Sequence, residues 1–151
     1  MMIPSIYVVA FFVSLLVSVG SMPFVIKFAK RYGFVDQINH RKIHKKEMPR
    51  LGGVSIILGA IAGLIVIRPE SDYLFGIGLG ALIIIITGLV DDKYTLDARA
   101  KFSAQIVAAL VVVGSGITIP FITLPLSGQF EFGVFTYLIT VLWIVGITNS
   151  I

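Results

Sequence analysis

Long apolar stretches separated by short clusters of charge dominate the pattern along the chain. No Asp, Glu, Lys or Arg occurs within residues 1–26, 51–67, 73–90, 102–130 or 132–151. A helix that crosses a membrane needs about 20 mainly apolar residues, with a range of about 17–25. The pattern therefore predicts five spanning helices, at about residues 5–27, 51–68, 73–90, 101–116 and 133–150.

The segment between the fourth and fifth predicted helices has a different character. Residues 117–132 read ITIPFITLPLSGQFEF, with Pro120, Pro125, several β-branched residues and the turn-forming pair Ser127-Gly128. Proline disfavours a continuous helix here, and short β-branched runs on either side of a turn are typical of a hairpin. We expect a short extended hairpin.

Composition favours a membrane protein over a soluble one. Hydrophobic residues make up 57% of the chain and charged residues 13%, against about 25% charged in an ordinary soluble protein. Five buried core helices in 151 residues would leave too little polar surface to cover them. The first apolar run has positive charges after it, not before it, which predicts a retained helix and not a cleaved signal peptide. The chain has no cysteine, which excludes disulfides and thiolate metal sites.

The positions of Lys and Arg predict the orientation. Residues 27–50 hold eight of the twelve, and residues 91–101 hold three. With five spans these two segments lie on the same side of the membrane, which the positive-inside rule makes cytoplasmic. The N-terminus and the predicted hairpin would then lie on the outer face.

The first of these segments contains a dense basic loop. Residues 36–53 read DQINHRKIHKKEMPRLGG. Membrane orientation and attraction to anionic lipid would explain the cations alone, but they do not explain the two histidines or the closing PRLGG. Arginine binds phosphate oxygens through two parallel hydrogen bonds, whereas lysine binds them as a point charge. The cations of this loop could therefore hold phosphate oxygens.

The second segment carries an acidic pair. Residues 88–102 read GLVDDKYTLDARAKF, with Asp91 and Asp92 directly after the third predicted span. Two carboxylates at a membrane boundary are costly unless a cation or donor meets them, although solvated residues at a helix end would look the same. Lys101 could pair with Asp97 four residues earlier, extend to the membrane interface, or bind phosphate. An acidic pair facing a basic loop suits a diphosphate with Mg²⁺, the acids holding the metal or acting as a base.

Together with the terminal TNSI, these motifs resemble the polyprenyl-phosphate N-acetylhexosamine-1-phosphate transferases, in order and spacing over all 151 residues. The form RKIH…PRLGG is closer to the N-acetylglucosamine-1-phosphate branch than to the peptidoglycan translocase. The resemblance implies that the phosphate of undecaprenyl phosphate attacks a UDP-N-acetylhexosamine, releasing UMP and starting a lipid-linked envelope glycan. It implies Mg²⁺, with Mn²⁺ as an alternative.

The resemblance also assigns roles to residues. Asp91 and Asp92 match the acidic pair given to lipid-phosphate activation or to the Mg²⁺ region, and Lys101 matches a lysine that contacts phosphate. Asn149 matches the first Asn of a longer motif near the metal. The resemblance gives the candidate phosphate-binding residues of the first cytoplasmic loop as Arg41, Lys42, His44 and Arg50.

The expected fold class is an all-α polytopic protein of the bacterial cytoplasmic membrane, with a cytoplasmic active face. Because family members have about ten spans, we expect residues 1–151 to be the N-terminal half of one transferase domain, inactive by itself. The expected partners are undecaprenyl phosphate, the UDP-sugar and membrane lipid, with a homodimer left open and no nucleic acid. The alternative is a non-catalytic membrane protein, a transporter or a lipid-binding subunit. The absence of charges from the middle of the spans argues against transport.

Overall fold

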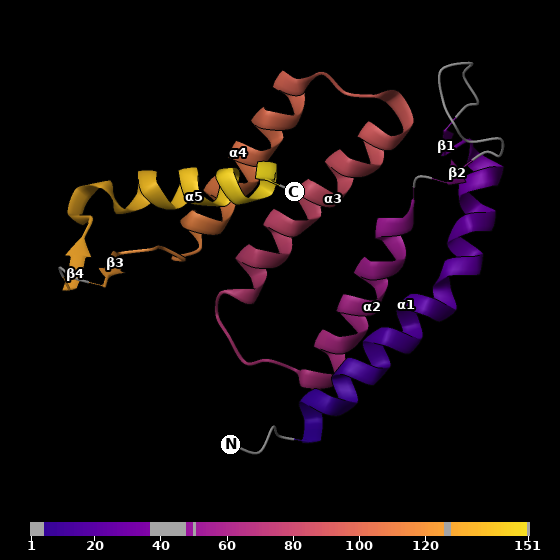
Figure 1. Cartoon of the computed structure of the whole chain (residues 1–151), viewed down its shortest axis with the longest axis horizontal. Coiled ribbons are helices and arrows are strands. Elements are labelled where there is room, and N and C mark those ends of the chain that lie inside the picture. Colours follow the sequence, from indigo (N-terminus) through magenta and orange to yellow (C-terminus); the bar gives the residue numbers. More distant parts are fainter. Residues whose placement is uncertain (1–4, 37–47, 50, 126–127, 151) are drawn as a thin grey trace. The chain divides into compact units, whose positions relative to one another are not determined.

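Helices account for most of the computed structural model, which describes residues 5–36, 48–49, 51–125 and 128–150. Figure 1 shows the five α-helices of these residues: α1 (Ser5–Tyr32), α2 (Gly52–Ile67), α3 (Leu74–Tyr94), α4 (Ala98–Gly114) and α5 (Thr136–Ser150). The chain divides into two compact units, Met1–Glu70 and Ser71–Ile151. Each unit is described by itself.

The helices have the apolar surface of a membrane protein. Three segments are long and apolar enough to cross a bilayer: α1, α3 and the segment Gly133–Ser150 that ends with α5. Large side chains such as Leu16 and Phe75 are more than two-thirds exposed, as expected where lipid covers them. The other two predicted spans form shorter helices, α2 of 16 residues and α4 of 17 residues. At 1.5 Å per residue, α2 rises about 24 Å, against about 30 Å for a hydrocarbon core.

The first unit is a pair of helices packed through small residues. Ser55, Gly59 and Gly63 are the buried residues of α2, and they face α1. A Cβ atom added at Gly59 would lie 2.6 Å from the carbonyl oxygen of Ser14, so the two backbones approach too closely for any side chain there. Small residues four apart allow this approach between membrane helices. Two short strands, β1 (Val35–Asp36) and β2 (Met48–Pro49), pair antiparallel beyond α1, a feature the sequence did not predict.

The second unit joins a helix pair to the predicted hairpin. Glycine again allows α3 and α4 to approach, because a Cβ atom added at Gly80 would lie 2.6 Å from Val112 Cγ2. The hairpin expected after the fourth span is confirmed as β3 (Phe121–Leu124) and β4 (Gly128–Glu131), in the antiparallel register Leu124↔Gly128. A short 3-10 helix, η1 (Gly133–Phe135), leads into α5. The Ile119 N–H donates to Thr140 Oγ1 at 2.9 Å, which anchors the start of the hairpin to α5.

Helix boundaries differ from the sequence prediction where charge begins. The third helix was expected to end at residue 90, but α3 continues to Tyr94, so Asp91 and Asp92 lie in its last turn and not after it. The fourth was expected from residue 101, but α4 starts at Ala98, which places Lys101 within the helix. The apolar run marks where a helix can meet lipid, whereas backbone hydrogen bonds continue the helix into the polar region.

Candidate functional site

The end of α3 is organised by Asp91. Thr95 has a left-handed backbone conformation with φ of 53°, which is rare for a β-branched residue. Two hydrogen bonds hold this turn: the Thr95 N–H donates to the Asp91 carbonyl at 2.8 Å, and the Leu96 N–H donates to Asp91 Oδ1 at 2.8 Å. The side chain of Asp91 thus fixes the path by which the chain leaves α3 and enters α4.

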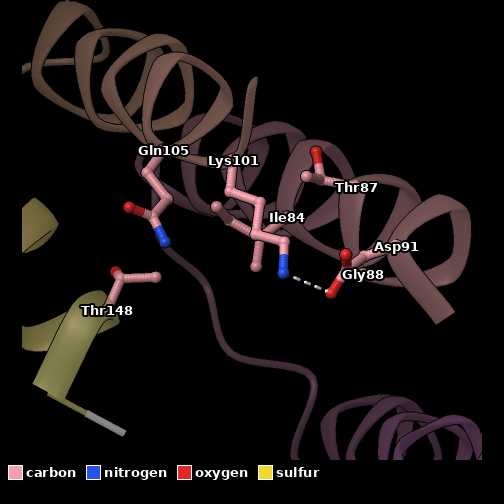
Figure 2. Close-up of a pocket in the computed structure, with 7 residues that line it drawn as sticks. All are labelled: Ile84, Thr87, Gly88, Asp91, Lys101, Gln105 and Thr148. Atoms are coloured by element: carbon pink, nitrogen blue, oxygen red, sulfur yellow. Dashed lines mark ion pairs between the residues drawn. The ribbon is translucent and has the colours of Figure 1, made fainter. Parts of the chain in front are cut away.

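The other carboxylate oxygen of Asp91 meets Lys101. Lys101 Nζ lies 2.8 Å from Asp91 Oδ2, with side chains 41% and 30% exposed respectively; Figure 2 draws this ion pair as a dashed line. The local alternative from sequence, an ion pair between Lys101 and Asp97, is absent among the described residues; their backbones alone are bonded, from the Lys101 N–H to the Asp97 carbonyl. The first member of the acidic pair, Asp91, therefore meets a cation from the first turn of α4.

The ion pair lies at the wall of a pocket of about 190 Å³ within the second unit. Ile84 and Gly88 of α3 form its apolar side, and its polar lining residues are Thr87, Asp91, Lys101, Gln105 and Thr148 (Figure 2). Pockets for drug-sized ligands measure about 300–1,000 Å³. This one suits a single polar group of a larger substrate, such as a phosphate.

The hydroxyls of the two pocket threonines donate to carbonyls of their own helices. Thr87 Oγ1 donates to the Ile83 carbonyl at 2.7 Å, and Thr148 Oγ1 donates to the Ile144 carbonyl at 2.7 Å. A hydroxyl has one proton and two lone pairs. With the proton committed to the helix backbone, each threonine has only acceptor capacity left.

Asn149 reaches the pocket through Gln105. Asn149 Nδ2 donates to Gln105 Oε1 at 2.6 Å and to the Val145 carbonyl at 3.0 Å. The first of these bonds joins α5 to α4, across 44 positions of sequence. Asn149 itself is not among the residues that line the pocket.

The predicted site residues are therefore only partly brought together. Asp91 and Lys101 form an ion pair, Asp92 shares the last turn of α3, and Asn149 is connected through Gln105. The predicted phosphate-binding residues of the basic loop lie outside the described residues: Arg41, Lys42, His44 and Arg50.

Three polar residues of the pocket were not predicted: Thr87, Gln105 and Thr148. Helical spacing could have found two of them, because Thr87 lies four residues before Asp91 and Gln105 four residues after Lys101, so each pair shares a helix face. Thr148 begins the TNSI motif, next to Asn149.

The donor atoms are of the kind that Mg²⁺ takes. Among the described residues no three His, Cys, Asp or Glu side chains gather as a metal cage. Mg²⁺ in phosphate-processing sites commonly uses one or two carboxylates and completes its shell with water and substrate phosphates. Asp91 and Asp92 supply carboxylates of this ligand type in the last turn of α3, although both oxygens of Asp91 already meet the Leu96 N–H and Lys101.

Proteins similar to this chain are named as transferases that use a polyprenyl phosphate. A "Probable undecaprenyl-phosphate N-acetylglucosaminyl 1-phosphate transferase" of Bacillus subtilis is 46% identical over 147 residues, covering 95% of this chain and 41% of that relative. A decaprenyl-phosphate N-acetylglucosaminephosphotransferase of Mycobacterium tuberculosis is 32% identical over 110 residues, covering 66% of this chain and 27% of the relative. No solved structure matches the chain.

The chain thus spans about two-fifths of the length of the Bacillus relative. The family model described as "Glycosyl transferase family 4" matches residues 74–151, about half of the chain. That range begins with α3 and contains every residue that lines the pocket. The chain therefore belongs to glycosyl transferase family 4.

Proposed function

We propose that the whole transferase domain to which residues 1–151 contribute transfers N-acetylglucosamine 1-phosphate from UDP-N-acetylglucosamine to undecaprenyl phosphate, with release of UMP. The names of its relatives support the transferred group, N-acetylglucosamine 1-phosphate, and this class of acceptor. The structural observation that carries the proposal is the Asp91–Lys101 ion pair at the wall of a small polar pocket. The alternative of a non-catalytic transporter or lipid-binding subunit is not favoured, since neither family nor relatives point to it.

The reaction joins two negatively charged phosphates, so the site has to stabilise their negative charge. A phosphate oxygen of the lipid forms a bond to the sugar-bearing phosphorus, and the bond from that phosphorus to the oxygen of UMP breaks. Lys101 supplies a cation for phosphate oxygens, and Asp91 holds its ammonium group in place. Such positioning and charge stabilisation supply most of the catalysis in phosphoryl transfer.

The acidic pair has two roles open to it. Asp91 and Asp92 accept the proton of the lipid phosphate, or they hold Mg²⁺, or Mn²⁺ in its place, with the Asn149 side chain nearby. When bound, such an ion would neutralise charge on the diphosphate. Asp91 already accepts the Leu96 N–H and meets Lys101, so its geometry suits holding the turn and the lysine.

The basic loop supplies the remaining cations in this proposal. Arg41, Lys42, His44 and Arg50 bind phosphate oxygens of the two substrates. Both ends of the loop are paired, because Val35 of β1 lies opposite Pro49 of β2. Antiparallel pairing of this kind fixes where a loop leaves and returns, whatever its own conformation.

We further propose the membrane arrangement predicted from charge. The protein crosses the bacterial cytoplasmic membrane five times within these residues, with its N-terminus and the β3–β4 hairpin outside and the site on the cytoplasmic face. By the family resemblance, these spans are half of a fold of about ten. A shorter helix such as α2 can be accommodated by local thinning of the bilayer. A homodimer is compatible with this arrangement.

The test is UMP release in membranes from cells that carry the gene, compared with membranes from a deletion strain. UDP-N-acetylglucosamine, undecaprenyl phosphate and Mg²⁺ are supplied together, and each is then omitted in turn. We expect UMP only in the complete mixture with gene-bearing membranes. Equal UMP release from the two membrane preparations would refute the proposal.

A further inference from the structure

A chain of hydrogen bonds fixes which way the Gln105 amide faces. The oxygen and nitrogen of an amide are nearly indistinguishable by shape, so their placement has to follow from their partners. The Val145 carbonyl can only accept, so the atom of Asn149 that lies 3.0 Å from it has to be the donor, Nδ2. That same Nδ2 lies 2.6 Å from Gln105, which therefore has to present its acceptor, Oε1, to Asn149.

It follows that Gln105 turns its amide nitrogen away from Asn149. Figure 2 shows this nitrogen directed into the space between Lys101 and Thr148. Gln105 is half-buried and lines the pocket. Among the described residues, no hydrogen bond from Gln105 Nε2 is formed, although an amide nitrogen carries two protons to donate.

The pocket therefore combines a neutral donor with a cation. Lys101 Nζ and Gln105 Nε2 come from successive turns of the same face of α4, four residues apart. Asp91 neutralises part of the lysine charge, so a second donor adds to what the lysine alone can offer an anion. The nearby threonine hydroxyls have committed their protons to the Ile83 and Ile144 carbonyls and cannot serve as donors in their present rotamers.

We propose that Gln105 is a substrate-binding residue whose Nε2 donates a hydrogen bond to a phosphoryl oxygen held beside Lys101. Asn149 acts as its positioning residue, because its bonds to Val145 and Gln105 keep the nitrogen directed into the pocket. This inference rests on the proposed function, which provides two sources of phosphoryl oxygen, the lipid phosphate and the diphosphate of the UDP-sugar. Both offer the same acceptor chemistry, and binding measurements separate them.

Two substitutions test the donor role. Gln105→Glu keeps an oxygen for Asn149 but replaces the donating nitrogen with a second oxygen, and Gln105→Met removes the amide without adding charge. Gln129→Glu is the matched control, because Gln129 lies exposed on β4 outside the pocket. The measurement is the Kd of the purified protein for undecaprenyl phosphate and, separately, for UDP-N-acetylglucosamine, with thermal unfolding of each variant recorded alongside.

We expect both Gln105 variants to raise one of the two Kd values by about 10- to 100-fold, the range for a hydrogen bond to a charged group. The ligand affected identifies the source of the phosphoryl oxygen. The Gln129→Glu control and the unfolding temperature of Gln105→Glu should stay unchanged. The inference would be overturned if, in both variants, both Kd values stayed within twofold of those of the unsubstituted protein. It would also be overturned if only Gln105→Glu weakened binding, because that result would reflect repulsion by the added charge.

Turnover separates this inference from the proposed function. UMP release by the unsubstituted protein, with unchanged Kd values in both Gln105 variants, would refute the role of Gln105 alone. Weakened binding in those variants without any turnover in the unsubstituted protein would refute the proposed reaction and leave the phosphate-binding role standing. An unsubstituted protein that binds neither ligand would overturn both.

Discussion

Replacing Asp91 or Asp92 by Asn, one at a time, should remove most of the transferase activity and leave the fold in place. Asparagine has the shape of aspartate but neither its charge nor its capacity to accept a proton. Loss of a general acid or base costs about 10²–10⁴-fold in rate. A hundredfold loss corresponds to about 2.7 kcal/mol of transition-state stabilisation, at about 1.36 kcal/mol for each factor of ten.

The cost in stability should be much smaller for Asp91→Asn. The Leu96 N–H lies 2.8 Å from Asp91 Oδ1, and the amide oxygen of asparagine can accept the same bond. What is lost is the ion pair with Lys101, whose side chain is 41% exposed while that of Asp91 is 30% exposed. Exposed ion pairs contribute about 0–1 kcal/mol. The loss of activity, expressed as free energy, should therefore exceed the loss of stability at least twofold.

The assay combines UMP release in membranes with thermal unfolding of the purified protein in detergent. Asp97→Asn is the matched control, because Asp97 is exposed and its side chain makes no capping hydrogen bond at the start of α4. A double variant, Asp91→Lys with Lys101→Asp, restores opposite charges at the pair but exchanges their positions. It should remain inactive, and it should regain only the ion-pair part of the stability, because lysine at position 91 cannot accept the Leu96 N–H. Recovered activity in this variant, or a loss below tenfold at both Asp91 and Asp92, would show that the acidic pair acts only on the structure.

Three further outcomes are expected. Gly59→Ala should destabilise the purified protein by about 1–3 kcal/mol, the usual cost of overpacking, since the new Cβ would lie 2.6 Å from the Ser14 carbonyl oxygen. Gly78→Ala is the control and should be neutral or stabilising, because a Cβ added there would have no neighbouring atom within 4 Å. In whole cells, a membrane-impermeant thiol reagent should label Gln129→Cys but not Arg99→Cys, and the reverse pattern would invert the proposed orientation; the lack of native cysteines in the chain keeps the background low. EDTA should abolish UMP release, and Mg²⁺ or Mn²⁺ should restore it. Activity that persists in EDTA would show that the reaction needs no divalent metal ion.

Helices and hairpin could be predicted because they depend on local composition. Each apolar run is long enough to favour a helix, and the five observed helices occupy those runs. The β3–β4 hairpin follows from proline on one side and Gly128 on the other, where φ is +76°. A glycine adopts that conformation without steric cost. The β1–β2 pair was missed because two-residue strands carry no periodic pattern.

The site was only partly predictable because its contacts depend on tertiary geometry. Asp91 and Lys101 are ten residues apart, and they meet only because the left-handed turn at Thr95 reverses the chain. Sequence spacing favoured Asp97 as the partner of Lys101, since four residues is the spacing of neighbours on a helix face. Asp97 instead precedes the helix in an extended conformation, which takes its side chain off that face.

A radioactive label on the donor shows whether the sugar moves with its phosphate or without it. UDP-N-acetylglucosamine labelled with ³²P at its β-phosphate is incubated with undecaprenyl phosphate, Mg²⁺ and membranes that contain the protein, and lipid and aqueous products are separated. Transfer of the sugar 1-phosphate predicts that the label appears in the lipid fraction and that unlabelled UMP is released. Label that leaves as UDP while the sugar alone enters the lipid would identify an ordinary glycosyl transfer and contradict the account.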